Sequence, residues 1–237
     1  LDTDGDGTVD IPGYGFQRFE DYSGSGFSDI EIGLRYQYLN TPNWRLAFTG
    51  GVRLPTGDID DPDNLTDIPF GSGAWALLFR LNNDYTGIEK LVLNATLKYD
   101  LVLPDSATVR VPEDPNQPIT ANKEKVHRNQ GDIFEIELSG TYQFLQSLSL
   151  SLLYDYSFAL KDSVSGDMGY AYDSLEDESD WTAHYFTIGL NYSTIPLYAE
   201  KKFPIPMTAS IEYENWFAGS NNILKQQLFN FVATFFF

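Results

Sequence analysis

The chain has 237 residues, enough for one domain or one barrel, and its 34 Asp and Glu residues against 15 Lys and Arg residues give a formal net charge of −19. A surface this acidic repels phosphate backbones, so we expect no nucleic acid among the partners. The absence of cysteine excludes disulfide scaffolds, thiolate zinc sites and cysteine nucleophiles. No apolar run approaches the ~18 residues of a membrane-spanning helix, yet 15% of the residues are aromatic.

The first ten residues, LDTDGDGTVD, place carboxylates at alternate positions with glycines between them. This spacing matches the first nine positions of a calcium-binding loop, including the glycine at its sharp turn. Gly13 stands where such a loop has its bidentate glutamate, so the sequence predicts weak calcium binding, with a solvated acidic linker as the alternative. No other cofactor is expected, and the predicted calcium ligands are Asp2, Asp4, Asp6, Thr8 and Asp10.

Residues 1–25 are predicted to form an acidic, glycine-rich loop or a partial strand on the extracellular side, ahead of a barrel over residues 26–237. The chain opens without the basic and apolar regions of a targeting signal, so either a signal peptide has been removed or the chain is the later part of a longer one.

From residue 30 onward, apolar residues recur at every second position, the period of a strand with two different faces. The runs exceed the ~5–6 residues of ordinary strands and reach the ~9–11 that a tilted strand needs to cross a bilayer. A soluble β-sandwich, which also alternates, is the alternative. The nine predicted strands cover residues 30–38, 44–54, 75–81, 91–103, 134–144, 147–160, 185–192, 205–214 and 229–237.

The predicted connections alternate in length, with short turns at residues 40–43, 82–89 and 146 and long loops at 55–70, 104–130 and 161–180. This asymmetry is typical of outer-membrane barrels, whose long loops face outward. Aromatic residues gather near the strand ends, which predicts two girdles. The short-turn girdle would hold Tyr36, Tyr38, Trp44, Phe79, Tyr142, Phe144, Phe235 and Phe237, and the long-loop girdle Tyr154, Tyr156, Phe158, Trp181, Tyr213 and Phe217.

The predicted fold is therefore all-β, an antiparallel transmembrane β-barrel in the bacterial outer membrane, surrounded by lipid and lipopolysaccharide. The final strand, with Phe229, Phe231, Phe235 and Phe237, resembles the signal that the barrel assembly machinery reads during biogenesis. If Phe237 ends on the periplasmic side, nine strands put the start of the first one outside. An even strand number then needs at least one further strand, either a weak one at residues 14–22 or, as we expect, one in upstream chain, which gives a closed barrel of 10 to 12 strands.

Residues 24–84 carry a family resemblance. The segments SGSGFSDIEIGLRYQYL, WRLAFTGGVRLPTGD and FGSGAWALLFRLNNDY contain a Ser-Gly-x-x-Asp strand opening, a Gly-x-x-x-Pro-Thr-Gly-Asp strand exit and a glycine-rich re-entry. This is similar to the outer-membrane transporter family associated with the meta-pathway (MetA-pathway) of phenol degradation. The resemblance implies a membrane barrel and the uptake of small hydrophobic or aromatic compounds. The matching positions are Gly24, Gly26, Asp29, Gly51, Pro55, Thr56, Gly57, Asp58, Gly71 and Gly73.

The face opposite the apolar one carries charges of both signs. They predict either a salt-bridge network that fills a narrow barrel or a polar path lined by charge. We therefore expect a porin-like channel for passive transport of small solutes. The alternative is a plugged structural barrel whose acidic loops or outer wall bind a partner protein. The predicted lumen residues are Glu31, Arg35, Arg45, Arg53, Arg80, Lys98, Asp100, Glu135, Glu137, Asp155, Glu212 and Glu214.

No enzyme site is predicted. His184 shares the parity of Phe186 and Ile188 and so faces lipid, whereas His127 lies in a long loop, and neither shows a pairing with Ser or Asp in the sequence.

Overall fold

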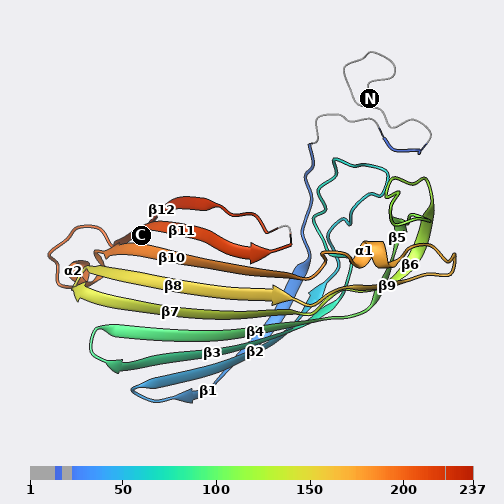
Figure 1. The fold of residues 1–237 in the computed structure, drawn as a ribbon. Coiled ribbons are helices and arrows are strands. Elements are labelled where there is room, and N and C mark those ends of the chain that lie inside the picture. The colour runs from blue at the N-terminus through green and yellow to red at the C-terminus, as the bar shows by residue number, and fades with distance from the viewer. Residues whose placement is uncertain (1–13, 18–22, 222, 237) are drawn as a thin grey trace, which may run out of the picture.

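A computed structural model describes residues 14–17, 23–221 and 223–236 of the chain (Figure 1). Nine long strands form one antiparallel sheet, in which each strand pairs with the next long strand of the chain. They contain 9 to 14 residues each, as a bilayer-crossing strand requires. In sheet order they are β1 (Ile30–Asn40), β2 (Trp44–Leu54), β3 (Ala76–Ile88), β4 (Leu91–Val102), β7 (Ile133–Leu145), β8 (Leu148–Ala159), β10 (Trp181–Ser193), β11 (Met207–Ser220) and β12 (Gln227–Phe235).

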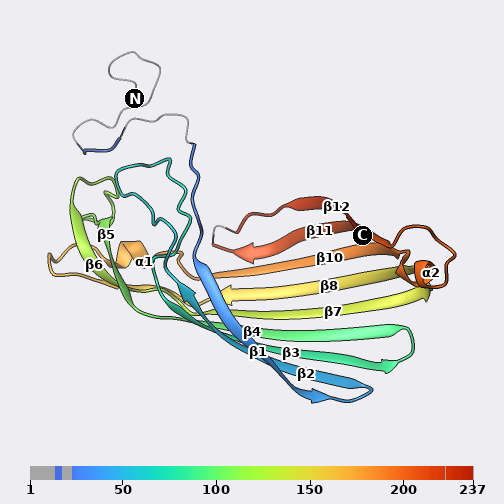
Figure 2. The same ribbon diagram turned by 180° about the vertical axis from the view of Figure 1, so that it is seen from behind.

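The two ends of the sheet differ, as Figures 1 and 2 show from opposite sides. At the short-turn end, strands are joined by residues 41–43, 89–90 and 146–147. At the long-loop end lie the connections 55–75, 103–132 and 160–180. The last strands depart from this rule, because β10 and β11 are joined at the short-turn end by residues 194–206, and β11 and β12 at the other end by only 221–226.

Within the described residues the sheet is open. β1 and β12 each pair with one neighbour, and every residue of both strands is exposed. The antiparallel architecture follows the prediction, but the predicted closure into a barrel of 10 to 12 strands is not observed in the described residues, where nine strands form an open sheet. In a bilayer both edges require a partner strand, because unpaired backbone groups in lipid are costly.

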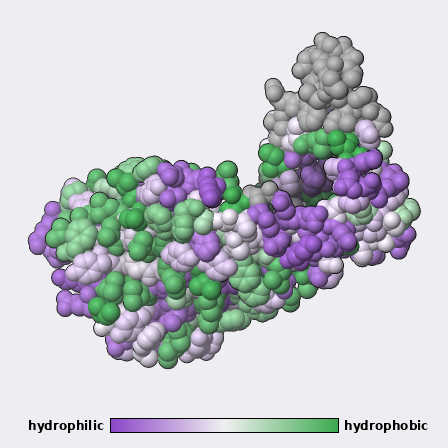
Figure 3. Space-filling view, viewed as in Figure 1, coloured by the Kyte–Doolittle hydropathy of each residue, from purple (hydrophilic) through white to green (hydrophobic). Residues whose placement is uncertain are grey.

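The two faces of the sheet have different chemistry. Large apolar side chains stand exposed on one face, here called the outer face, such as Leu34 (85% exposed) and Phe229 (77%). The opposite, inner face holds charged, polar and small residues, among them Asp155 (1%) and Ala183 (0%). Figure 3 shows many hydrophobic side chains over the strands and a band of hydrophilic ones where the long connections begin. Apolar residues turned toward solvent on this scale mark a membrane-facing surface.

Aromatic rings follow one another across the outer face near the long-loop end. Phe79, Tyr99, Phe134 and Phe158, on β3, β4, β7 and β8, stack with centroids 6.1, 4.5 and 4.9 Å apart. Of this row, only Phe158 belongs to the girdle predicted for that end, and Tyr99 and Phe134 were not predicted for either girdle. Phe79 was predicted for the other girdle, but β3 continues to Ile88, so Phe79 lies near the start of the strand rather than its end.

The long connections contain short strands and a helix that were not predicted from the sequence. β5 (Asp105–Arg110), β6 (Lys123–Asn129) and β9 (Ser163–Ser165) form a three-stranded sheet beside the short helix α1 (Asp173–Glu176). A second short helix, α2 (Ile195–Ala199), lies at the short-turn end (Figure 1). No helix of the described residues has the length and apolar character needed to span a membrane.

Candidate functional site

The candidate site is the inner face of the sheet. The structure places all twelve predicted lumen residues on this face, because side chains alternate along every strand. Arg35 and Arg45 are exposed and pair with no other described residue. The remaining ten fall into two groups, one on β1 to β4 and one on β7 to β11.

Ion pairs connect the first group. Arg53 Nη2 lies 2.7 Å from Glu31 Oε1 and 2.8 Å from Asp100 Oδ2, and Arg80 also pairs with Asp100. The Asp100 side chain is 8% exposed, so it depends on these two guanidinium groups for compensation of its charge. The network therefore fixes β2, β3 and β4 relative to one another.

Lys98 of β4 connects this group to the acidic residues of β7. Its ammonium pairs with Glu135 and lies 3.5 Å from Glu137 Oε2. Asp155 of β8 is aligned with Glu137 across the strand pair. One carboxylate oxygen from each of Glu135, Glu137 and Asp155 lies within 4.8 Å of the other two. This part of the inner face thus concentrates negative charge around a single ammonium group.

Two aromatic rings project beside these carboxylates. Tyr185 of β10 is aligned with Asp155 on one side and with Trp216 of β11 on the other. The two rings stack with centroids 4.6 Å apart and planes at 16°. The indole Nε1 of Trp216 donates a hydrogen bond to Glu214 Oε1 at 2.6 Å. A flat apolar surface next to hydrogen-bond acceptors suits an aromatic solute that carries a hydroxyl group.

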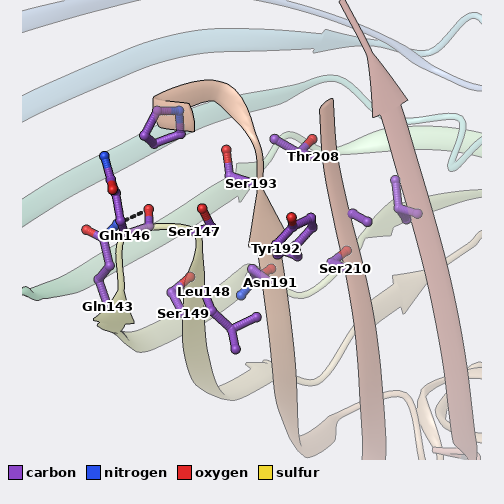
Figure 4. Close-up of a pocket in the computed structure, with 13 residues that line it drawn as sticks. Gln143, Gln146, Ser147, Leu148, Ser149, Asn191, Tyr192, Ser193, Thr208 and Ser210 are labelled. Carbon is purple, nitrogen blue, oxygen red and sulfur yellow. Dashed lines mark hydrogen bonds between the residues drawn. The ribbon is translucent and has the colours of Figure 1, made fainter. Parts of the chain in front are cut away.

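Nearer the short-turn end, the sheet forms a pocket of about 310 Å³ (Figure 4). Its lining is polar but includes no Asp, Glu, Lys or Arg, so it offers hydrogen bonds without a fixed charge. Strands β7, β8, β10 and β11 supply most of the polar groups, which include Gln143, Ser149, Asn191, Thr208 and Ser210.

At the long-loop end, a cavity of about 220 Å³ opens between the strands and the loops. Arg53, Ala76 and Val102 line it from the first strands, and Trp181 from β10. Trp181 was predicted for the outer girdle. It lies on the inner face instead, because β10 begins at Trp181 and carries Ala183 and Tyr185 on the same side.

The family motif proves to be a junction of three chain segments. The Asp29 carboxylate accepts hydrogen bonds from Gly57 N and Ser72 N, each at 3.0 Å. A Cβ at Gly57 would lie 2.7 Å from Gly71 Cα, so both positions must be glycine for the segments to touch. Burial raises the pKa of Asp29, but the hydrogen bonds from Ser72 and Gly57 outweigh it and lower the pKa below its usual value. We call this junction of Asp29, Gly57, Gly71 and Ser72 the clasp.

Arg110 of β5 ties the long connections together. It pairs with Asp63 at 2.5 Å, and Lys123 of β6 lies 2.7 Å from the same carboxylate. The hydrogen bonds from Lys123 and Arg110 lower the pKa of Asp63. The loops at this end are therefore held as one ordered unit. The Arg110 guanidinium also donates to the backbone oxygens of Tyr14, Gly15, Pro62 and Thr120.

Both histidines have partners that the sequence did not reveal. Ser106 Oγ lies 3.0 Å from His127 Nδ1 on the exposed three-stranded sheet, and Tyr154 Oη lies 2.8 Å from His184 Nδ1 on the outer face. No described carboxylate hydrogen-bonds either ring, so the third member of a Ser-His-Asp arrangement is missing among the described residues.

One predicted site, and one residue of another, lie outside the described residues. The calcium loop, with Asp2, Asp4, Asp6, Thr8 and Asp10, precedes the first described residue, and of the assembly signal Phe237 is also outside. The described members, Phe229, Phe231 and Phe235, are 77%, 70% and 49% exposed on the outer face of β12.

Sequence reasoning missed the inner aromatic pair. Tyr185 has the parity of Thr187 and Asn191 and was thus already on the inner side of the alternation. Trp216 has the parity of Glu212 and Glu214 but lies beyond the predicted end of its strand at residue 214, whereas β11 continues to Ser220.

Comparison with known proteins agrees with this architecture. The family model described as "Putative MetA-pathway of phenol degradation" matches residues 1–198. No curated protein sequence matches the chain. Among solved structures, the fold is similar to that of the COG4313 outer membrane channel from Pseudomonas putida F1, with a TM-score of 0.59 and 16% sequence identity over 90% of this chain and 68% of that one. The predicted outer-membrane type of antiparallel β fold is confirmed.

Proposed function

Because the chain belongs to this phenol-degradation MetA-pathway family, we propose that it is a channel of the bacterial outer membrane for passive uptake of small solutes, aromatic and other hydrophobic compounds among them. The channel fold of the similar solved structure supports the proposal. In this proposal the inner face is the wall of the path, and the chain performs no catalysis.

The observation that carries the aromatic preference is the stacked pair of Tyr185 and Trp216 on an otherwise polar wall. A phenolic ring can stack against Trp216 while its hydroxyl group donates to a neighbouring carboxylate such as Glu214. The uncharged pocket of Figure 4 then offers hydrogen bonds further along the sheet toward the short-turn end.

The outer face is proposed to contact lipid, with lipopolysaccharide around the long-loop end. The exposed rings of Phe229, Phe231 and Phe235 on β12 are proposed as the signal for the assembly machinery. We further propose that residues 1–25 lie on the extracellular side.

The test uses the full chain reconstituted in liposomes and planar bilayers, with phenol and a non-aromatic alcohol of similar size as solutes. Trp216→Leu should slow phenol flux about fivefold, since an aromatic contact contributes about 1 kcal/mol, and should leave the alcohol unaffected. The matched control is Trp44→Leu, because Trp44 packs against Tyr85 on the outer face, with ring centroids 4.5 Å apart, and should not influence flux.

Equal effects of the two variants on phenol would remove the aromatic preference and leave a general channel. A reconstituted protein with neither conductance nor liposome swelling would favour the alternative function, in which a plugged barrel presents its loops to a protein partner. The ordered three-stranded sheet, with Val126 of β6 and the adjoining Val111 fully buried, is the region in which a search for that partner would then begin.

A further inference from the structure

We propose that Glu135, Glu137 and Asp155 bind one hard divalent cation, Ca²⁺ in the first instance, on the inner face. One carboxylate oxygen from each of the three lies within 4.8 Å of the others. Two oxygens that both bind Ca²⁺ at about 2.4 Å can be at most about 4.8 Å apart. The spacing of the three oxygens thus meets this pairwise limit for sharing one ion.

A separate observation points to a missing ligand at Asp155. This residue is 1% exposed, and its Oδ2 has no hydrogen-bond partner among the described residues. Buried carboxylate oxygens are normally paired, because an unpaired one loses its hydration without compensation. Asp155 lies between Glu137 on β7 and Tyr185 on β10, and its carboxylate is part of the acidic cluster.

The nearby positive charge is too small to satisfy the cluster. Lys98 pairs with Glu135 and Glu137, and no ion pair joins it to Asp155. Strands β7, β8, β10, β11 and β12 contain no Lys or Arg at all. Three carboxylates against one ammonium leave two negative charges, which is the charge of one divalent cation.

The cluster is also accessible to an ion from solution. The side chains of Glu135 and Glu137 are 26% and 24% exposed, whereas Asp155 is buried behind them. Oxygen-only ligands favour Ca²⁺ or Mg²⁺ over transition metals. With three protein ligands we expect a dissociation constant on the order of 10⁻⁴–10⁻³ M.

The inner aromatic pair provides a specific readout. Tb³⁺ substitutes for Ca²⁺ and emits when excited through a nearby Tyr or Trp, and Tyr185 is the direct cross-strand neighbour of Asp155. The protein is the full chain in detergent, carrying Asp4→Ala and Asp6→Ala so that the N-terminal candidate loop contributes nothing. We expect sensitised emission that Ca²⁺ displaces, with Ca²⁺ calorimetry as a second measurement.

Asp155→Asn should weaken Ca²⁺ binding at least about tenfold, as the loss of one charged ligand predicts, and Lys98→Gln should strengthen it because the competing ammonium is gone. Asp84→Asn is the matched control: this inner-face carboxylate accepts a hydrogen bond from Asn94 and lies outside the cluster, so binding should not change.

Heat-modifiable migration on gels checks that each variant is folded, and Glu137→Gln replaces Asp155→Asn if the latter fails to fold. The proposal is overturned if no emission is displaced by millimolar Ca²⁺, or if the cluster variants behave like Asp84→Asn. A proton shared among the carboxylates would then account for the unpaired oxygen.

Discussion

The two halves of the sheet share one alternation of inner and outer residues, but they differ in whether the charged residues of the inner face are paired. Strands β1 to β4 carry both signs, and their best-buried acid, Asp100, is paired with Arg53 and Arg80. Strands β7 to β12 have no Lys or Arg to pair with their inner acids, which are Glu135, Glu137, Asp155, Glu212 and Glu214. Only Lys98, at the boundary, reaches across.

This difference teaches that a polar inner face can serve two purposes within one sheet. In the first half, paired charges neutralise one another and hold neighbouring strands in place. In the second half, the inner carboxylates have Lys98 as their one Lys or Arg partner among the described residues, and they lie beside the Tyr185–Trp216 stack. The first half thus corresponds to the salt-bridge network predicted from the sequence, and the charged path predicted as its alternative is our proposal for the second half.

The largest expected effect is on stability in the first half. Asp100→Ala removes the shared acceptor of Arg53 and Arg80 and should lower the free energy of unfolding by about 3 kcal/mol, because breaking a buried ion pair leaves uncompensated charge. Urea titration of the detergent-solubilised protein, followed by gel migration, measures this. Glu212→Ala, an unpaired acid of the second half, should change stability by less than about 0.5 kcal/mol; equal losses from both would abolish the distinction between the halves.

The next effect concerns ion selectivity in the second half. Replacing Glu135, Glu137 and Glu214 together by Gln should reduce the preference for cations over anions about tenfold, which corresponds to ~1.4 kcal/mol of electrostatic free energy. Reversal potentials in a salt gradient across a planar bilayer give this ratio. Neutralising Glu31, whose charge Arg53 already balances, is the comparison and should have a much smaller effect.

Which face each charged residue occupies was predictable from the sequence, because the period of a strand is two. Which residues pair was not, since pairing depends on cross-strand register and bulges shift that register between Gln37 and Leu39 and between His184 and Tyr185. The clasp was likewise beyond sequence reasoning. Pro55, Thr56, Gly57 and Asp58 suit a plain turn, whereas the carboxylate that fixes them, Asp29, is 28 residues away from Gly57 and 43 from Ser72.

The clasp in the first half should have a smaller, pH-dependent effect on the stability of loop 55–75. The pKa of Asp29 is lowered in the folded protein, so its contribution is fully present above the ordinary Asp pKa of about 4 and is lost as pH falls through the lower, folded value. We expect loop 55–75 to become more sensitive to an acid-active protease in that range. Asp29→Asn should remove this part of the pH dependence, because an amide does not titrate, and its nitrogen also cannot accept one of the two backbone hydrogen bonds. A variant with the same acid sensitivity as wild type would show that another group controls the loop.

The smallest effect is expected at Arg35, which shares the inner face with Arg53 but has no described partner and is exposed. Exposed, unpaired charges contribute little to stability, so Arg35→Gln should change the free energy of unfolding by no more than about 0.5 kcal/mol. Arg53→Gln, measured in the same urea titration, should cost several times more, because it leaves Glu31 without its partner and leaves Asp100 with Arg80 alone. Arg35 lies on β1, an edge strand with a single neighbour. A large loss from Arg35→Gln would therefore mean that a carboxylate on a further strand pairs with it along that edge, and the paired half of the inner face would extend beyond β1.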